Sequence, residues 1–147
     1  MTPTPRRRPA PLEMRQRSLR LPADTLERLD RLADERGQSA NTVAARLIEE
    51  GLRLERHPLI YFREAPAGRR PALLGTRLDV GQVVDTVRTH EGSVAAAAEY
   101  LAQPEPRIRA AVRYYAEFTD EVHAWSQRMR ELAEREEEAF RAAASLA

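Results

Sequence analysis

The sequence predicts a mainly α-helical fold that begins with a short strand, paired with the same strand of a second copy. Three patterns support this prediction. The segment from Gln16 to Pro22 alternates polar and apolar side chains, which is typical of a strand with one buried face. Two amphipathic helical patterns follow it. A hairpin pattern then precedes two short helices joined by a tight turn, as in helix-turn-helix and winged-helix domains, and a long C-terminal helix closes the chain.

The composition fits a folded, helix-rich protein. Hydrophobic residues make up 42% of the 147 residues and charged residues 32%, and there is no cysteine to form a disulfide or a thiolate. No apolar run approaches the roughly 18 residues that cross a membrane, and the N-terminal arginines precede no apolar signal segment. We therefore expect a cytoplasmic protein.

The net charge of +1 conceals opposite charges at the two ends of the chain. Residues 1–20 contain six arginines and one glutamate, whereas residues 116–147 contain eight acidic residues and four arginines. A basic N-terminal end suits nucleic acid, and an acidic C-terminal end suits a protein. The charge distribution therefore indicates two different partners.

The patterns divide the chain into four segments. Residues 1–13 hold four of the ten prolines and are expected to form a disordered Arg/Pro-rich arm, either a phosphate-contacting extension or a solubilising leader. Residues 14–56 hold the strand and two helices. Because Pro58 stops the second helix, residues 57–118 form a separate hairpin and helix-turn-helix-like domain. Residues 119–147 form the long C-terminal helix, with a frayed end.

The N-terminal strand needs a partner, because five or six residues cannot form a stable strand alone. Gly37 ends the first helix, and Ser39 can cap the second. The apolar residues that share one face of each helix are Leu26, Leu29, Leu32, Ala33, Val43, Ala44, Leu47, Ile48 and Leu52. This arrangement resembles the ribbon-helix-helix family of the Arc, MetJ and CopG type, whose dimeric ribbon enters the major groove of double-stranded DNA.

The resemblance implies a set of DNA contacts. If Leu19 and Leu21 face the dimer core, the base-reading side chains are those that alternate with them, namely Gln16, Ser18 and Arg20. Phosphates would be held near the positive end of the second helix. The residues assigned to phosphate binding are Arg15, Ser39, Ala40 and Asn41. The alternatives are a solvated edge strand and a Ser39 that only caps its helix.

The segment over residues 57–118 carries local signals for a hairpin and three helices. Residues 59–63 are strand-like, Ala67-Gly68 can turn, and residues 72–74 can pair back. Three residues suit helix starts: Asp79, Ser93 and Pro106. The short motifs His57-Pro58-Leu59-Ile60, Gly68-Arg69-Arg70-Pro71, Gly75-Thr76-Arg77 and Tyr114-Tyr115 resemble the domain of unknown function 433, over about residues 57–122. That domain recurs in VapB-type antitoxins.

Arginines of this domain form a candidate second DNA surface. They are Arg69 and Arg70 at the predicted hairpin tip, and Arg107, Arg109 and Arg113 on the last of the three helices. A solvated face, or a surface for a dimer mate or toxin, is the alternative reading of the helix.

The long C-terminal helix is a candidate toxin-binding element. Thr119 can cap it, and a heptad seam follows at Phe118, Val122, Trp125, Met129 and Leu132. The resemblance to VapB-type antitoxins implies a PIN-type ribonuclease toxin, whose metal-holding carboxylates an inserted arginine can block. The residues assigned to the toxin are Trp125, Arg128, Met129, Arg130, Leu132 and Arg135. Alternatively, the seam packs on its own chain or on a dimer mate.

No pattern indicates catalysis. The histidines His57, His90 and His123 lack metal-ligand spacing, and there is no HExxH, P-loop or GxGxxG motif. We therefore expect no enzyme, metal, cofactor or small-molecule substrate.

The function that these patterns and resemblances predict is that of a DNA-binding antitoxin of a type II toxin–antitoxin system. It would be a bacterial, nucleoid-associated homodimer that represses its own operon and neutralises a toxin protein. The alternative is a free-standing ribbon-helix-helix transcription regulator whose second domain mediates oligomerisation.

Overall fold

The computed structural model describes residues 12–145, and these form two units that divide after Ala44. Residues 1–11 of the predicted arm and residues 146–147 of the predicted frayed end lie outside the described part. The helices are α1 (Ala23–Arg36), α2 (Ala40–Arg56), α3 (Val80–Thr89), α4 (Val94–Tyr100), α5 (Glu105–Glu117) and α6 (Thr119–Ala144). The strands are β1 (Ile60–Arg63) and β2 (Arg70–Leu73).

The N-terminal strand predicted from the sequence is absent. Residues 12–22 have no regular secondary structure and are exposed throughout, and the only sheet in the described residues is the β1–β2 pair. Five or six residues find no strand partner within a single chain, and an isolated strand is not stable in water. The predicted ribbon-helix-helix fold class is therefore wrong. The described chain is mainly helical, with one two-stranded antiparallel sheet.

The first unit holds α1 and the first turn of α2. α1 ends at Gly37, whose left-handed backbone (φ 60°, ψ 34°) glycine adopts without strain. Ser39 caps α2 because its Oγ accepts the backbone N–H of Thr42 at 3.1 Å. Within residues 12–44 only Ala33 and Val43 are buried, and Leu26 remains 44% exposed. The apolar core of this unit is therefore small.

The second unit is built on the hairpin, in which Ile60 pairs with Leu73 and Arg63 with Arg70. Ile60 and Leu73 are fully buried and join the core formed with α3 and α5. The paired base of the hairpin therefore belongs to the core, which differs from the projecting wing of a winged-helix domain. This is a second difference from the predicted fold class.

Helices α3, α4 and α5 complete the core of the second unit. At the start of α3 the backbone N–H of Asp79 donates to Oε1 of Gln82 at 3.0 Å, and at the start of α4 Ser93 accepts the N–H of Ala96 at 3.1 Å. The buried core residues are Ile60, Leu73, Val80, Val83, Val84, Val87, Ala97, Ala98, Ile108, Ala111, Tyr114 and Val122. Small side chains on α3, α4 and α5 allow these short helices to pack closely.

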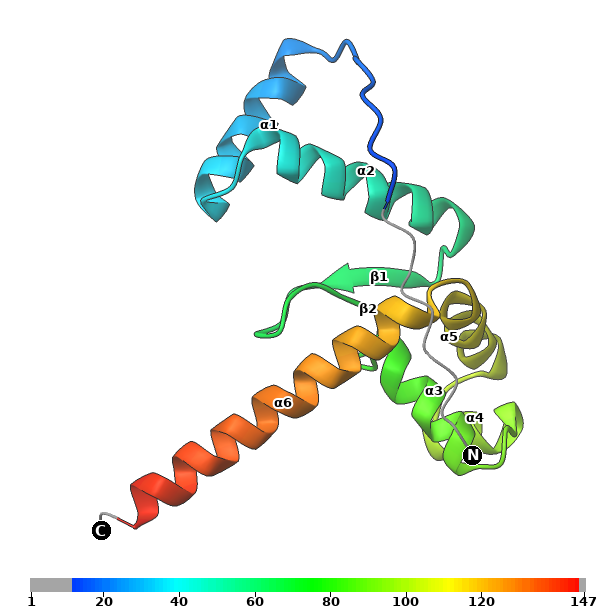
Figure 1. Ribbon diagram of the computed structural model, residues 1–147. Coiled ribbons are helices and arrows are strands. Elements are labelled where there is room, and N and C mark those ends of the chain that lie inside the picture. Colours follow the sequence, from blue (N-terminus) through cyan, green and yellow to red (C-terminus); the bar gives the residue numbers. More distant parts are fainter. Residues whose placement is uncertain (1–11, 146–147) are drawn as a thin grey trace, which may run out of the picture. The chain divides into compact units, whose positions relative to one another are not determined.

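Helix α6 packs on the rest of the second unit only along its first half. Thr119 is its first residue and not its cap, because the Thr119 hydroxyl donates to the carbonyl of Tyr115 at 2.7 Å. Val122 and Trp125 are buried, whereas every described residue after Leu132 is exposed. The 26 residues of α6 span about 39 Å, and the distal half runs away from α3, α4 and α5 (Figure 1).

Candidate nucleic-acid and partner interfaces

The predicted base-reading residues lie in the exposed segment that precedes α1. Gln16, Ser18 and Arg20 are all exposed, but the backbone here is not a strand, so the alternation that placed them on one face does not hold. Arg15 forms an exposed ion pair with Glu13 at 3.0 Å. Within residues 12–145, Arg17 and Arg20 have no hydrogen bond or ion pair. This segment therefore carries two unpaired cations.

The predicted phosphate-binding residues lie at the start of α2. Ser39 uses its Oγ to accept the Thr42 N–H, and the same oxygen lies 2.8 Å from the Thr42 hydroxyl. The backbone N–H groups of Ala40 and Asn41 belong to the first turn of the helix, where no carbonyl precedes them to accept. Such a turn can hold an anion.

The arginines of the candidate second DNA surface do not form one free surface. Arg69 lies 2.8 Å from Glu50 of α2 and 3.4 Å from Glu64. Arg70 lies 2.8 Å from Asp79 and 4.9 Å above the ring of Trp125. Both guanidinium groups are held by carboxylates and are at most a quarter exposed. The two hairpin arginines therefore stabilise the fold through these ion pairs.

The three arginines of α5 are placed differently from one another. Arg107 donates to the side chain of Gln103 at 3.1 Å, and Arg109 pairs with Glu105 at 3.2 Å. Arg113 is exposed and has no partner among the described residues. Of the five predicted arginines, Arg113 is the one that is both exposed and unpaired.

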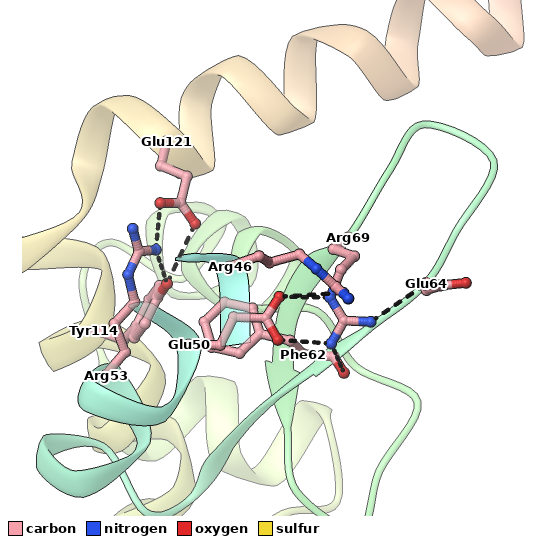
Figure 2. Close-up of polar contacts among 8 residues, drawn as sticks. All are labelled: Arg46, Glu50, Arg53, Phe62, Glu64, Arg69, Tyr114 and Glu121. Atoms are coloured by element: carbon pink, nitrogen blue, oxygen red, sulfur yellow. Dashed lines mark hydrogen bonds and ion pairs between the residues drawn. The ribbon is translucent and has the colours of Figure 1, made fainter. Parts of the chain in front are cut away.

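The sequence analysis missed an ion-pair cluster along α2. Figure 2 shows Arg53 between α5 and α6, where it donates to the hydroxyl of Tyr114 at 2.9 Å and also contacts Glu121. Its guanidinium lies 4.2 Å above the ring of Phe118. One turn earlier, Glu50 accepts a hydrogen bond from Arg69, which lies in the loop just before β2.

These contacts fix the second half of α2 to the hairpin, α5 and α6. The signal in the sequence was the recurrence of charged residues at positions 46, 50 and 53, which lie on one side of a helix. The apolar stripe of α2 alone predicted no partner for these charges. Burial raises the pKa of Tyr114, and the nearby carboxylate of Glu121 acts in the same direction.

A second missed contact lies just beyond the end of α2. His57 is 6% exposed, and its Nε2 lies 3.0 Å from the carboxylate of Glu117 on α5. Its ring meets that of Tyr114 edge to face, with 5.1 Å between centroids. The predicted helix break at Pro58 is thus accompanied by a polar and aromatic anchor to α5.

The predicted toxin-binding residues divide between buried and exposed positions. Trp125 is 6% exposed and packs against Arg70, so its ring is not available as an anchor for a partner. Met129 and Leu132 are half-buried. Arg128 and Arg130 are exposed without a partner among the described residues, and Arg135 donates to the carbonyl of Glu131 at 3.3 Å.

Asp79 is the buried carboxylate of the second unit. It is 2% exposed and lies between Arg70, at 2.8 Å, and Arg63, at 3.4 Å. Burial raises its pKa to about 6, and the positive charge of Arg63 offsets only part of this effect.

No family model matches the chain, and no curated protein or solved structure is detectably similar to it. Across residues 12–145 no helix has both the length and the apolar character needed to cross a membrane. In the same residues no group of three or more histidine, aspartate or glutamate side chains is placed to hold a metal ion. Function must therefore be inferred from the surfaces of the chain itself.

Proposed function

We propose that this protein is a DNA-binding antitoxin, which represses its own operon and neutralises a toxin protein by binding alone. The observation that carries the DNA half of the proposal is the exposed N-terminal segment, in which Arg17 and Arg20 have no ion-pair partner among the described residues. Exposed arginines without carboxylate partners attract DNA phosphates and release counterions from them. This activity belongs in the bacterial cytoplasm, at the nucleoid.

The start of α2 supports the same half of the proposal. The free N–H groups of Ala40 and Asn41 can donate to a phosphate oxygen while Ser39 keeps its capping bond. Backbone contacts of this kind position a protein on DNA without reading sequence.

The toxin half of the proposal rests on α6. Beyond Leu132 this helix is exposed on all sides, although it carries the apolar Phe140, which is 75% exposed. An exposed helix that is continuous with a packed one presents a ready surface for a partner. The arginines Arg128 and Arg130 supply unpaired cations for an acidic toxin site, which suits a PIN-type ribonuclease.

A second candidate function is that of a free-standing transcription regulator whose second unit mediates oligomerisation. It is favoured by the exposed apolar residues of α2, namely Leu47 (43% exposed), Ile48 (49%) and Leu52 (62%). Exposed leucine and isoleucine side chains that share one region of a helix are typical of association surfaces. A homodimer is compatible with both candidate functions.

DNA binding is tested by fluorescence anisotropy on the full chain, with labelled duplexes from upstream of its own gene. We expect the variant Arg17→Ala/Arg20→Ala to bind more weakly and to reduce the slope of log K against log salt concentration by about two. The matched control is Arg28→Ala, because Arg28 is exposed on α1 but already paired with Asp24 at 3.5 Å. Equal affinities for all three proteins, or no binding by any, would contradict the proposal.

The two candidate functions are separated by purifying the tagged protein from its host after nuclease treatment. Mass spectrometry of the co-purified proteins should show a small ribonuclease-like partner in near-equal amount if the protein is an antitoxin. A homodimer free of such a partner would instead support the free-standing regulator.

A further inference from the structure

A groove of about 460 Å³ lies in the second unit, between α3 and α6 and beside β2. Arg70 of β2, Gln82 of α3, and Trp125, Ser126 and Arg130 of α6 line it together with Met129. Its volume lies in the range of pockets that hold small molecules. The groove shares Arg130 with the surface proposed above for a toxin.

The carboxylates in the groove are already neutralised by the chain. Asp79 pairs with Arg70 at 2.8 Å, and Asp85 pairs with Arg88 at 3.2 Å. Arg130 lines the same groove and has no hydrogen bond or ion pair within residues 12–145. The groove therefore carries one cation that no carboxylate of the described chain balances.

Some hydrogen-bond donors at the groove have no acceptor among the described residues. Gln82 uses its Oε1 to accept the N–H of Asp79, which leaves its amide NH₂ group to donate outward. Trp125 is only 6% exposed, and its Nε1–H has no acceptor among the described residues. The same holds for Nε–H of Arg70. These two N–H groups are buried too deeply for a ligand to touch, so the donors that a ligand in the groove can reach are those of Arg130, Gln82 and Ser126.

We propose that the groove between α3 and α6 binds a small organic anion through a carboxylate or phosphate group. The Arg130 guanidinium supplies the charge, and the amide of Gln82 and the hydroxyl of Ser126 supply further donors to the same oxygens. Met129 provides an apolar wall for the carbon skeleton. Such a ligand would bridge α3 and α6, and this inference does not depend on the proposed function.

Trp125 provides the measurement, because it is the one tryptophan of the chain and lines the groove. Its fluorescence is followed in the full-length protein during titration with succinate, glycerol phosphate and inorganic phosphate, at constant ionic strength. We expect a saturable change with at least one organic anion, and about tenfold or greater weakening in Arg130→Ala. A stronger response to succinate would indicate a carboxylate ligand, and a stronger response to glycerol phosphate would indicate a phosphate ligand.

The matched control is Arg128→Ala. Arg128 is also exposed and unpaired on α6 within the described residues, but it does not line the groove. We expect this variant to bind as the unmodified protein does. Equal weakening in both variants would overturn the proposal, because it would indicate non-specific attraction to the helix. The absence of a saturable fluorescence change with all three anions would overturn it as well.

Discussion

At the scale of single residues, Arg53 joins three helices of the second unit. It extends from α2, pairs with Glu49 at 2.8 Å on its own helix, and reaches Tyr114 of α5 and Glu121 of α6. Only 17% of its side chain is exposed, so water screens these contacts weakly. Removing one member of such a cluster leaves the remaining polar groups unsatisfied in a partly buried place.

We expect Arg53→Ala to lower the free energy of unfolding by about 2 kcal/mol, which urea denaturation followed by circular dichroism would measure. Arg56→Ala is the matched control, because Arg56 is 75% exposed and lies 3.7 Å from Glu117. Its loss should change stability by less than about 0.5 kcal/mol. Similar losses in the two variants would show that the Arg53 cluster stabilises no more than a surface pair.

Asp79 gives the second unit a defined dependence on pH. Its pKa is raised from 3.8 to about 6 by burial, so the folded chain binds a proton there at a pH where the unfolded chain does not. Its contribution to stability is therefore greatest below pH 4 and is lost as the pH rises to about 6. We expect Asp79→Asn to reduce the difference in unfolding free energy between pH 4.5 and pH 7. If this difference were the same in the variant, the pH dependence of stability would belong to other groups.

At the scale of secondary-structure elements, the packing of α3 on α6 depends on a glycine. A Cβ added at Gly81 would lie 2.9 Å from Oγ of Ser126, closer than side-chain contacts allow. The absence of a side chain at position 81 therefore permits the close approach of the two helices, beside the groove described above.

We expect Gly81→Ala to destabilise the second unit by about 1–2 kcal/mol, measured as the midpoint of urea unfolding. The double variant Gly81→Ala/Ser126→Ala should recover most of this loss, because it removes the oxygen that the new methyl group would meet. Gly51→Ala on α2 is the opposite control. A Cβ there meets nothing within 4 Å, so alanine should stabilise the helix by about 0.5–1 kcal/mol. If Gly81→Ala left the stability unchanged, α6 would be able to move away from α3 without destabilising the second unit.

Local signals in the sequence were sufficient for several element boundaries. Gly37 and Ser93 act through bonds to residues a few positions away, so their roles at helix ends were predictable. The predicted strand at Gln16–Pro22 was wrong because strand formation depends on a partner that local alternation cannot supply. The packing of Trp125 on its own chain was one of two readings that the sequence left open, since its partner Arg70 lies more than fifty residues earlier.

At the scale of the whole molecule, α2 belongs to both units. Its first turn lies in the unit that ends at Ala44, and the remainder lies in the second unit, where Glu50 and Arg53 fix it. α6 has the same division within the second unit, because it is packed as far as Leu132 and exposed from there on. The exposed distal half of α6, which is proposed for the toxin, is therefore continuous with a half that packs within the second unit.

Deleting residues 133–147 separates the fold from the proposed toxin surface. We expect thermal unfolding to change by less than about 2 °C, since the described residues removed are all exposed. DNA affinity should stay the same or rise slightly, because the deletion removes four glutamates and two arginines and so makes the chain more positive. Co-purification of the toxin should weaken or be lost. A truncated chain that unfolds early would instead show that distal α6 is covered in solution by a second copy or by its own chain. Undiminished toxin capture would place the partner surface nearer Arg128 and Arg130.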